Sequence, residues 1–242
     1  MLLSTSAFGQ RWKYYRHEVS FGAGSANYFG DIGGSPDASK LLGLKDYRIS
    51  ETRFNAHVGW TYFYTKDFAV RGNLGYAILT ASDAKSKLEY RGLSFNSNII
   101  EFSGQAEYFI LSEYKRRHAA AVFNRRGMVN ATAKYGVYTF AGLGGVYMMP
   151  KVSGPVSGGH ITNGYSPVNM VFPVGIGARL SLAKRWSIGY EIGARFSTSD
   201  YIDGFHTIWS KSPDVYWFTT FYGIYKIKTD RYGYPILFKK GR

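Results

Sequence analysis

The chain has 242 residues and a formal net charge of +14, with 18% aromatic residues, 29 glycines and no cysteine. This length suits one domain or two small ones, and the missing cysteines exclude disulfides, zinc–thiolate sites and a thiol nucleophile. No run of about 18 apolar residues is present, which excludes a transmembrane helix. The excess of Tyr, Phe and Gly favours an all-β protein, because aromatics suit strands and Gly marks turns and bulges.

The first residues, "MLLSTSAFGQ", are typical of the end of a secretory signal peptide. Ala7 and Gly9 form a small-x-small cleavage pattern, so we expect cleavage before Gln10 and a signal remnant at 1–9. The basic region that usually opens a signal peptide is missing. An ordinary N-terminal segment is therefore the alternative interpretation.

Eight stretches show the alternation of a β-strand, in which successive side chains point to opposite faces. In the seventh stretch, apolar Ile188, Tyr190 and Ile192 alternate with Glu191 and Arg195 on the other face. Every stretch reaches the roughly nine to eleven residues that a tilted membrane strand needs. The predicted strands are 16–29, 50–64, 68–81, 95–111, 136–149, 170–182, 187–199 and 214–227.

Short and long connections alternate along the chain. The second and third strands are joined by "TKD" (65–67), and the sixth and seventh by "AKR" (183–185). An even number of strands with short turns on one side is the pattern of a bacterial outer-membrane barrel. We predict an eight-stranded antiparallel up-and-down transmembrane β-barrel over 10–227, with both termini periplasmic and a basic tail at 228–242. The longer connections on the other side are 30–49, 82–94, 150–169 and 200–213.

The polar strand faces predict a lumen filled with side chains. In a transmembrane barrel the apolar face meets lipid, and eight strands enclose an interior just wide enough for side chains. Five acids and four bases fall on the polar faces, so we predict lumen ion pairs among them. The faces of 136–149 and 214–227, which alternate poorly, stay open. The predicted lumen residues are Glu18, Glu51, Arg53, Arg71, Glu101, Glu107, Arg179, Glu191 and Arg195.

Other functional classes have little support in the sequence. The five histidines share no metal-type spacing, so no metal or cofactor is predicted. A catalytic set drawn from Ser50, Glu51 and His57 would point to two opposite faces, so we predict no enzyme. A lumen packed with charges leaves little open path for a pore. The cations lie at strand ends and in loops and not on a basic helix, which argues against nucleic-acid binding.

Basic residues gather in the unusually long connection 112–135 and in the tail. We predict that both lie on the periplasmic side and dock an acidic or polar partner, because charge sets orientation and encounter rate. The apolar "YPILF" (234–238) in the tail favours docking over the alternative, a rim that faces solvent or lipid headgroups. The predicted partner-binding residues are Lys115, Arg116, Arg117, Arg125, Arg126, Lys134, Arg231, Lys239 and Lys240.

Four stretches occur in a fixed order along the chain: "FGAGSANYFGDIGG" (21–34), "RGLSFNSNIIEFSGQAEYFIL" (91–111), "YTFAGLGGVYMMPK" (138–151) and "FPVGIGARLSLAKRWSIGYEIGARFSTSDYIDGF" (172–205). This ordered combination, ending in "DYIDG" (200–204), is more specific than the aromatic–glycine alternation that many barrels share. It resembles barrels of the PorG type, and the match covers most of 16–227.

The resemblance implies an outer-membrane component of the type IX secretion system of Bacteroidetes-type bacteria. Barrels of this family are associated with a periplasmic ring made of a lipoprotein (PorK) and a partner protein (PorN), and they help to tether it in support of secretion and gliding motility. The expected partners are outer-membrane lipids, the two ring proteins and other type IX components. No catalytic or ring-contact residue carries over. The alternative is a generic small barrel that acts as an adhesin or membrane-integrity protein through its surface loops.

Overall fold

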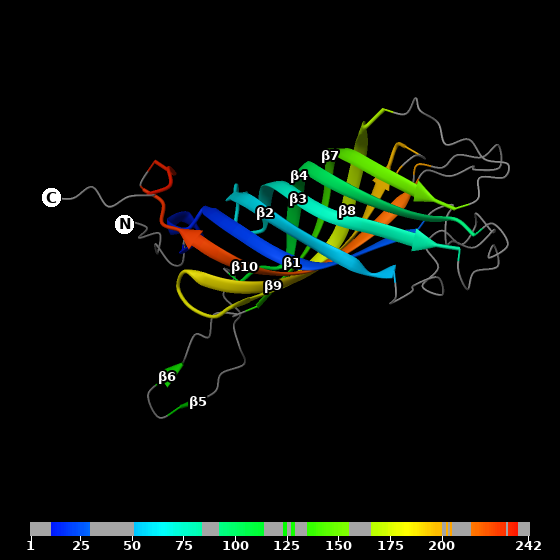
Figure 1. Cartoon of the computed structure of the whole chain (residues 1–242). Coiled ribbons are helices and arrows are strands. Elements are labelled where there is room, and N and C mark those ends of the chain that lie inside the picture. Colours follow the sequence, from blue (N-terminus) through cyan, green and yellow to red (C-terminus); the bar gives the residue numbers. More distant parts are fainter. Residues whose placement is uncertain are drawn as a thin grey trace.

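Eight antiparallel strands close into a barrel, as predicted (Figure 1). Around the barrel they follow the order β1-β10-β9-β8-β7-β4-β3-β2. Their bounds are β1 His17–Phe29, β2 Arg53–Phe63, β3 Phe68–Ser82, β4 Ser94–Leu111, β7 Tyr135–Ser153, β8 Val168–Ser181, β9 Trp186–Ser197 and β10 Val215–Ile227. These bounds match the predicted stretches to within a few residues, because the alternation that predicts a strand also sets its length.

Two smaller elements accompany the barrel. A 3-10 helix, Arg11–Tyr14, precedes β1. A short hairpin of β5 (Phe123–Asn124) and β6 (Gly127–Met128), which was not predicted, lies in the connection from β4 to β7. The computed structural model describes residues 11–29, 51–83, 92–113, 123–124, 127–128, 135–154, 166–199, 202, 204, 214–230 and 232–236.

The strands are strongly tilted around the barrel axis. Following the paired Cα positions from Ile100 of β4 once around the barrel returns to β4 at Leu111. Such a stagger between the first and last pairing is the shear that closure of a barrel requires. It brings residues far apart in the sequence to the same level of the interior.

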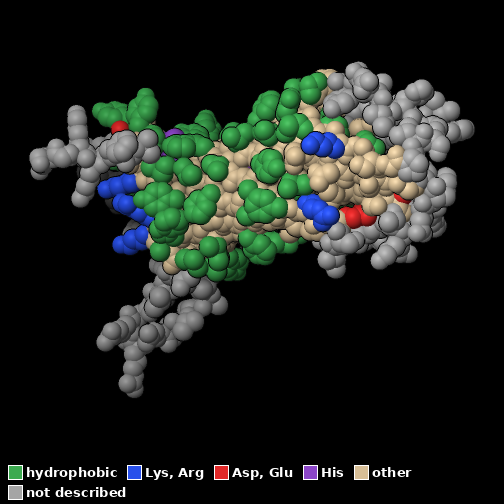
Figure 2. Space-filling model, viewed as in Figure 1, with side chains coloured by type: hydrophobic (Ala, Val, Ile, Leu, Met, Phe, Trp, Pro, Cys, Tyr) green, Lys and Arg blue, Asp and Glu red, His purple; other side chains and the backbone are tan. Residues whose placement is uncertain are grey.

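The wall is apolar outside and polar inside, which is the reverse of a soluble barrel. In β4, Ile100, Phe102 and Ile110 are exposed, whereas the alternating Glu101 and Glu107 are buried. Figure 2 shows the hydrophobic side chains as a belt over the wall, with Lys and Arg toward its two edges. A closed barrel with an apolar belt and a polar interior is built to span a bilayer with its strands. Within the described ranges, no helix is long and apolar enough to cross a membrane.

The two ends of the barrel differ. The turns Tyr64–Asp67 and Leu182–Arg185 close one end, which we call the short-turn end, and β1 begins and β10 ends there. The opposite end, the loop end, carries the four longer predicted connections, most of whose residues lie outside the described ranges. Exposed aromatic side chains lie at the outer surface of the short-turn end, among them Trp60, Tyr64 and Trp186.

The interior has an apolar part that was not predicted. Fourteen buried apolar residues, including Tyr28, Phe95 and Met148, pack into one cluster toward the loop end. A second cluster, which includes Phe63 and Phe109, lies toward the short-turn end. The expectation of a lumen packed with charges therefore needs correction, since the charged residues occupy its middle and its short-turn part.

Candidate functional site: the charged interior and the short-turn end

The interior network is centred on Arg71 of β3. Its Nη2 donates to Gln105 Oε1 of β4 and to Glu191 Oε2 of β9, each at 2.7 Å. Its Nε lies 3.0 Å from Glu107 Oε1, and its guanidinium lies 5.5 Å from the centre of the Phe140 ring. Arg71 is thus a buried cation between two carboxylates, and it connects opposite walls of the barrel.

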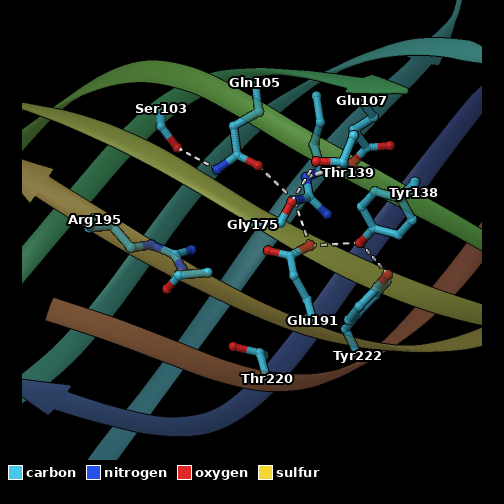
Figure 3. A network of polar contacts seen from close by, with 12 residues as sticks. Ser103, Gln105, Glu107, Tyr138, Thr139, Gly175, Glu191, Arg195, Thr220 and Tyr222 are labelled. Atoms are coloured by element: carbon cyan, nitrogen blue, oxygen red, sulfur yellow. Dashed lines mark hydrogen bonds and ion pairs between the residues drawn. The ribbon is translucent and has the colours of Figure 1, made fainter. Parts of the chain in front are cut away.

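Two tyrosines extend this network across the barrel (Figure 3). The Tyr138 hydroxyl donates to Glu191 Oε2 at 2.7 Å and lies 2.6 Å from the Tyr222 hydroxyl. Their rings have room because the residues beneath them are glycines. A Cβ on Gly177 would lie 2.3 Å from the Tyr138 ring, and a Cβ on Gly189 equally close to the Tyr222 ring. At these two positions glycine therefore allows the side chain of a neighbouring strand to pack directly against the backbone.

A separate group lies next to the loop-end apolar cluster. The Tyr216 hydroxyl donates to Glu101 Oε2 at 2.8 Å, and Arg195 Nε lies 3.7 Å from the same oxygen. Arg195 also donates from Nη1 to the Gly193 carbonyl at 2.7 Å, and its guanidinium lies 4.3 Å from the centre of the Phe218 ring. These contacts pair a buried arginine with a buried glutamate at the border of an apolar region.

A third group lies toward the short-turn end. Arg179 Nη2 donates to Glu18 Oε1 at 2.8 Å and to Glu113 Oε1 at 2.7 Å. Lys226 Nζ donates to the same Glu113 oxygen at 2.8 Å. All four side chains are buried. The group contains two carboxylates and two cations, so its formal charges balance.

The structure brings together seven of the nine residues predicted as lumen ion pairs. Glu18, Arg71, Glu101, Glu107, Arg179, Glu191 and Arg195 are buried within the barrel and form ion pairs with one another. The other two require correction: Glu51 precedes β2 and is half-buried, and Arg53 is exposed at the loop end of β2. For both, the alternation was extended past the rim of the barrel, where a side chain no longer has to point inward.

Sequence reasoning missed Glu113 and Lys226 as interior residues. Glu113 follows the end of β4, where no strand pattern applies, and Lys226 lies near the end of β10, a strand whose inner face was not assigned from the sequence. The alternation of β10 could have found Lys226, because it lies in phase with Tyr222 and Ile224, which are also buried. Aromatic residues on both faces of that strand hide this phase.

All nine predicted partner-binding residues lie outside the described ranges. Their placement stays a prediction. The described part of the short-turn end is nevertheless basic, with exposed Lys66 and Lys184 in its turns and Lys13 and Lys228 next to the barrel. Arg185, in the same turn as Lys184, donates from Nη1 to the Tyr225 hydroxyl at 3.3 Å.

The residues considered for catalysis do not form a described site. His57 lies on the inner face of β2, and its ring centroid lies 5.9 Å from that of Tyr222. Ser50 is outside the described ranges, and Glu51 lies near the loop end. Among the described residues, no group of three or more His, Cys, Asp or Glu side chains could hold a metal ion.

Comparisons with known proteins give likeness of fold only. No protein-family model matches the chain, and no curated protein matches it. Neisserial surface protein A is similar over 87% of this chain and 96% of its own, at 10% identity and a TM-score of 0.48. Ail of Yersinia pestis, crystallised with the heparin analogue sucrose octasulfate, is similar over 86% and 98%, at 11% identity and 0.40. The outer membrane enzyme PagL is similar over 87% and 99%, at 12% identity and 0.35.

The Glu113 carboxylate predicts a pH dependence of stability. Burial raises the pKa of this group, but the neighbouring Arg179 and Lys226 outweigh burial and hold the pKa of Glu113 below its ordinary value of 4.5. A depressed pKa contributes stability above the ordinary value, and this contribution is lost as the pH falls through the folded-state value. We expect the urea midpoint of the Glu113→Gln variant to lie below that of the native chain at pH 7, with the gap closing toward pH 3. A gap that is constant over this range would contradict the assignment.

The filled interior also predicts that the barrel does not conduct ions. Apolar clusters and paired charges from all eight strands occupy the interior of an eight-stranded barrel, which is just wide enough for side chains. We expect the purified chain in planar lipid bilayers to leave the conductance at the background of the lipid alone. Reproducible single-channel steps from a folded preparation would show an open path that this packing does not provide.

Proposed function

We propose that this chain is a non-enzymatic outer-membrane component of a type IX protein secretion machinery of a Bacteroidetes-type bacterium. In this role it anchors and positions a periplasmic ring made of a lipoprotein and its partner, of the PorK and PorN type. The reason for naming this particular machinery is the resemblance of several stretches to PorG-type barrels. The transmembrane architecture supports the outer membrane as location, because bacterial barrels with short turns on one side are found there with those turns in the periplasm.

The observation that carries the proposal is the combination of a filled interior and a basic short-turn end. An interior occupied by paired side chains suits a rigid membrane anchor better than a channel. Exposed Lys66, Lys184 and Arg185 extend from the tight turns of the same end, and the predicted partner-binding segments begin there. Cations at this position would steer and orient an acidic or polar partner.

Copurification tests the proposal. A tagged chain is extracted from outer membranes with a gentle detergent, and the proteins recovered with it are identified by mass spectrometry. We expect the ring lipoprotein and its partner in a stable ratio to the barrel. Recovery of the folded, heat-modifiable barrel alone would contradict the anchoring role.

Matched charge variants locate the docking side. The Lys66→Glu/Lys184→Glu variant changes two exposed cations of the short-turn end, and Arg53→Glu/Lys151→Glu changes two exposed cations of the loop end. We expect only the first variant to lose the ring proteins, provided both remain heat-modifiable. The opposite result, or loss of function on shortening the 30–49 or 150–169 connection, would favour the adhesin or membrane-integrity role instead.

A further inference from the structure

After the last strand, the described residues 228–230 and 232–236 fold back on one another as a small hairpin, which we call the hairpin 228–236. An antiparallel bridge joins Thr229 to Pro235, and the Ile236 N–H donates to the Lys228 carbonyl at 2.7 Å. Asp230 Oδ1 accepts the backbone N–H groups of Tyr232 and Tyr234, each at 2.9 Å. These bonds give the segment a defined shape, so the positions of its side chains follow from the fold.

The hairpin is fastened to the segment that leads into β1. The Thr229 N–H donates to the Tyr14 carbonyl at 2.8 Å, and the Arg16 N–H donates to Thr229 Oγ1 at 3.0 Å. The tip residue Gly233, with a φ of +94°, has its carbonyl 3.0 Å from His17 Nε2. Figure 1 shows this end of the chain curled next to the start of β1 at the short-turn end.

The position of the His17 side chain shows on which side of the barrel wall the hairpin tip lies. It alternates with Glu18, whose side chain is buried inside, so the His17 ring is on the outer face. Trp60 Nε1 donates to His17 Nδ1 at 3.2 Å, and the Tyr62 ring centroid lies 5.0 Å from that of His17. Because Nδ1 accepts from Trp60, Nε2 carries the proton and donates to Gly233. The hairpin therefore lies against the outer wall, where His17 links its tip to Trp60.

The hairpin presents two exposed tyrosines. Tyr232 is 87% exposed and Tyr234 is 70% exposed. Lys13 and Lys228 are exposed close to the attachment point. Tyrosine has an apolar ring and a polar tip, and it is enriched where a membrane protein crosses the headgroup region. Nearby lysines are attracted to anionic lipids.

We infer that the hairpin 228–236 binds the phospholipid surface of the leaflet at the short-turn end, with Tyr232 and Tyr234 in the headgroup region. The occupant follows from continuity: the tip touches His17, His17 touches Trp60, and Trp60 belongs to the apolar belt that faces lipid. A tail that projected away from the membrane would have no such contacts with the outer wall. For these residues the inference favours the rim that faces lipid headgroups over partner docking, and it does not depend on ring anchoring.

Spin labels on single cysteines test the inference, since the native chain has no cysteine. The Tyr232→Cys variant is labelled and reconstituted in vesicles of phosphatidylethanolamine and phosphatidylglycerol. Collision rates with oxygen, which partitions into lipid, and with a water-soluble nickel chelate give the depth of the label. Val58→Cys, on the exposed apolar wall, and Lys66→Cys, in an exposed turn, provide the lipid and water references.

We expect the nickel accessibility at Tyr232→Cys to lie clearly below that at Lys66→Cys and above that at Val58→Cys. Adding Asp230→Ala, which removes the acceptor that shapes the hairpin, should move it toward the Lys66→Cys value. Accessibility at Tyr232→Cys equal to that at Lys66→Cys in the native background would overturn the inference. The vesicles contain no other protein, so this result is independent of whether a secretion ring binds.

Discussion

Replacing Arg71 by methionine is expected to lower the free energy of unfolding of the barrel by about 3–5 kcal/mol, because it leaves two buried carboxylates without their cation. Arg71 contacts Glu107 and Glu191 in an interior where none of the three is exposed. The measurement is urea unfolding of the reconstituted barrel, followed by its heat-modifiable mobility on gels. The matched control is Arg53→Met, since exposed charges contribute little to stability.

A companion variant separates charge from packing. Combining Arg71→Met with Glu107→Gln and Glu191→Gln removes the whole charge cluster, and we expect it to recover much of the stability lost in Arg71→Met. The reason is that removing one member of a buried ion pair leaves an uncompensated charge and destabilises the fold, whereas replacing all members by neutral residues costs much less stability. If Arg71→Met cost no more than Arg53→Met, the interior network would not be a determinant of barrel stability.

The second large effect is expected at Gly189, beneath the Tyr222 ring. A Cβ at this position would lie 2.3 Å from the ring, so Gly189→Ala must displace the tyrosine and disturb its contact with Tyr138. Overpacking of this kind costs about 1–3 kcal/mol. The control is Gly104→Ala on the outer face, where a Cβ would meet nothing within 4 Å. Equal urea midpoints for the two variants would show that the ring position is not tightly set.

Much of the fold could be predicted because a membrane strand carries its own pattern. In β4, the alternation of apolar residues with Glu101 and Glu107 gives the strand, its length and its inner face at once. The same reasoning reached seven interior charges from the sequence alone. It failed for Arg53, which is the first residue of β2. At this end of the strand a side chain is exposed whichever face it is on, so the alternation no longer indicates burial.

The pairing inside the barrel could not be predicted from the sequence. Arg71 and Glu191 lie 120 positions apart, and they meet only because closure with a strong stagger brings β3 and β9 to one level. The inner face of β7 was also hidden. There, Tyr138, Phe140 and Met148 serve apolar clusters inside the barrel, so the contrast between an apolar outside and a polar inside is lost.

Site-specific photo-crosslinking in intact cells is the sharpest test of the proposal that the short-turn end docks a periplasmic ring. A photoreactive amino acid is placed at Lys66 or Lys184 in the turns, and at Lys151 near the loop end as the matched position. We expect crosslinks to the ring lipoprotein or its partner from the two turn positions and not from Lys151. Crosslinks to those proteins from Lys151 alone, or from no position in cells that assemble the ring, would contradict it.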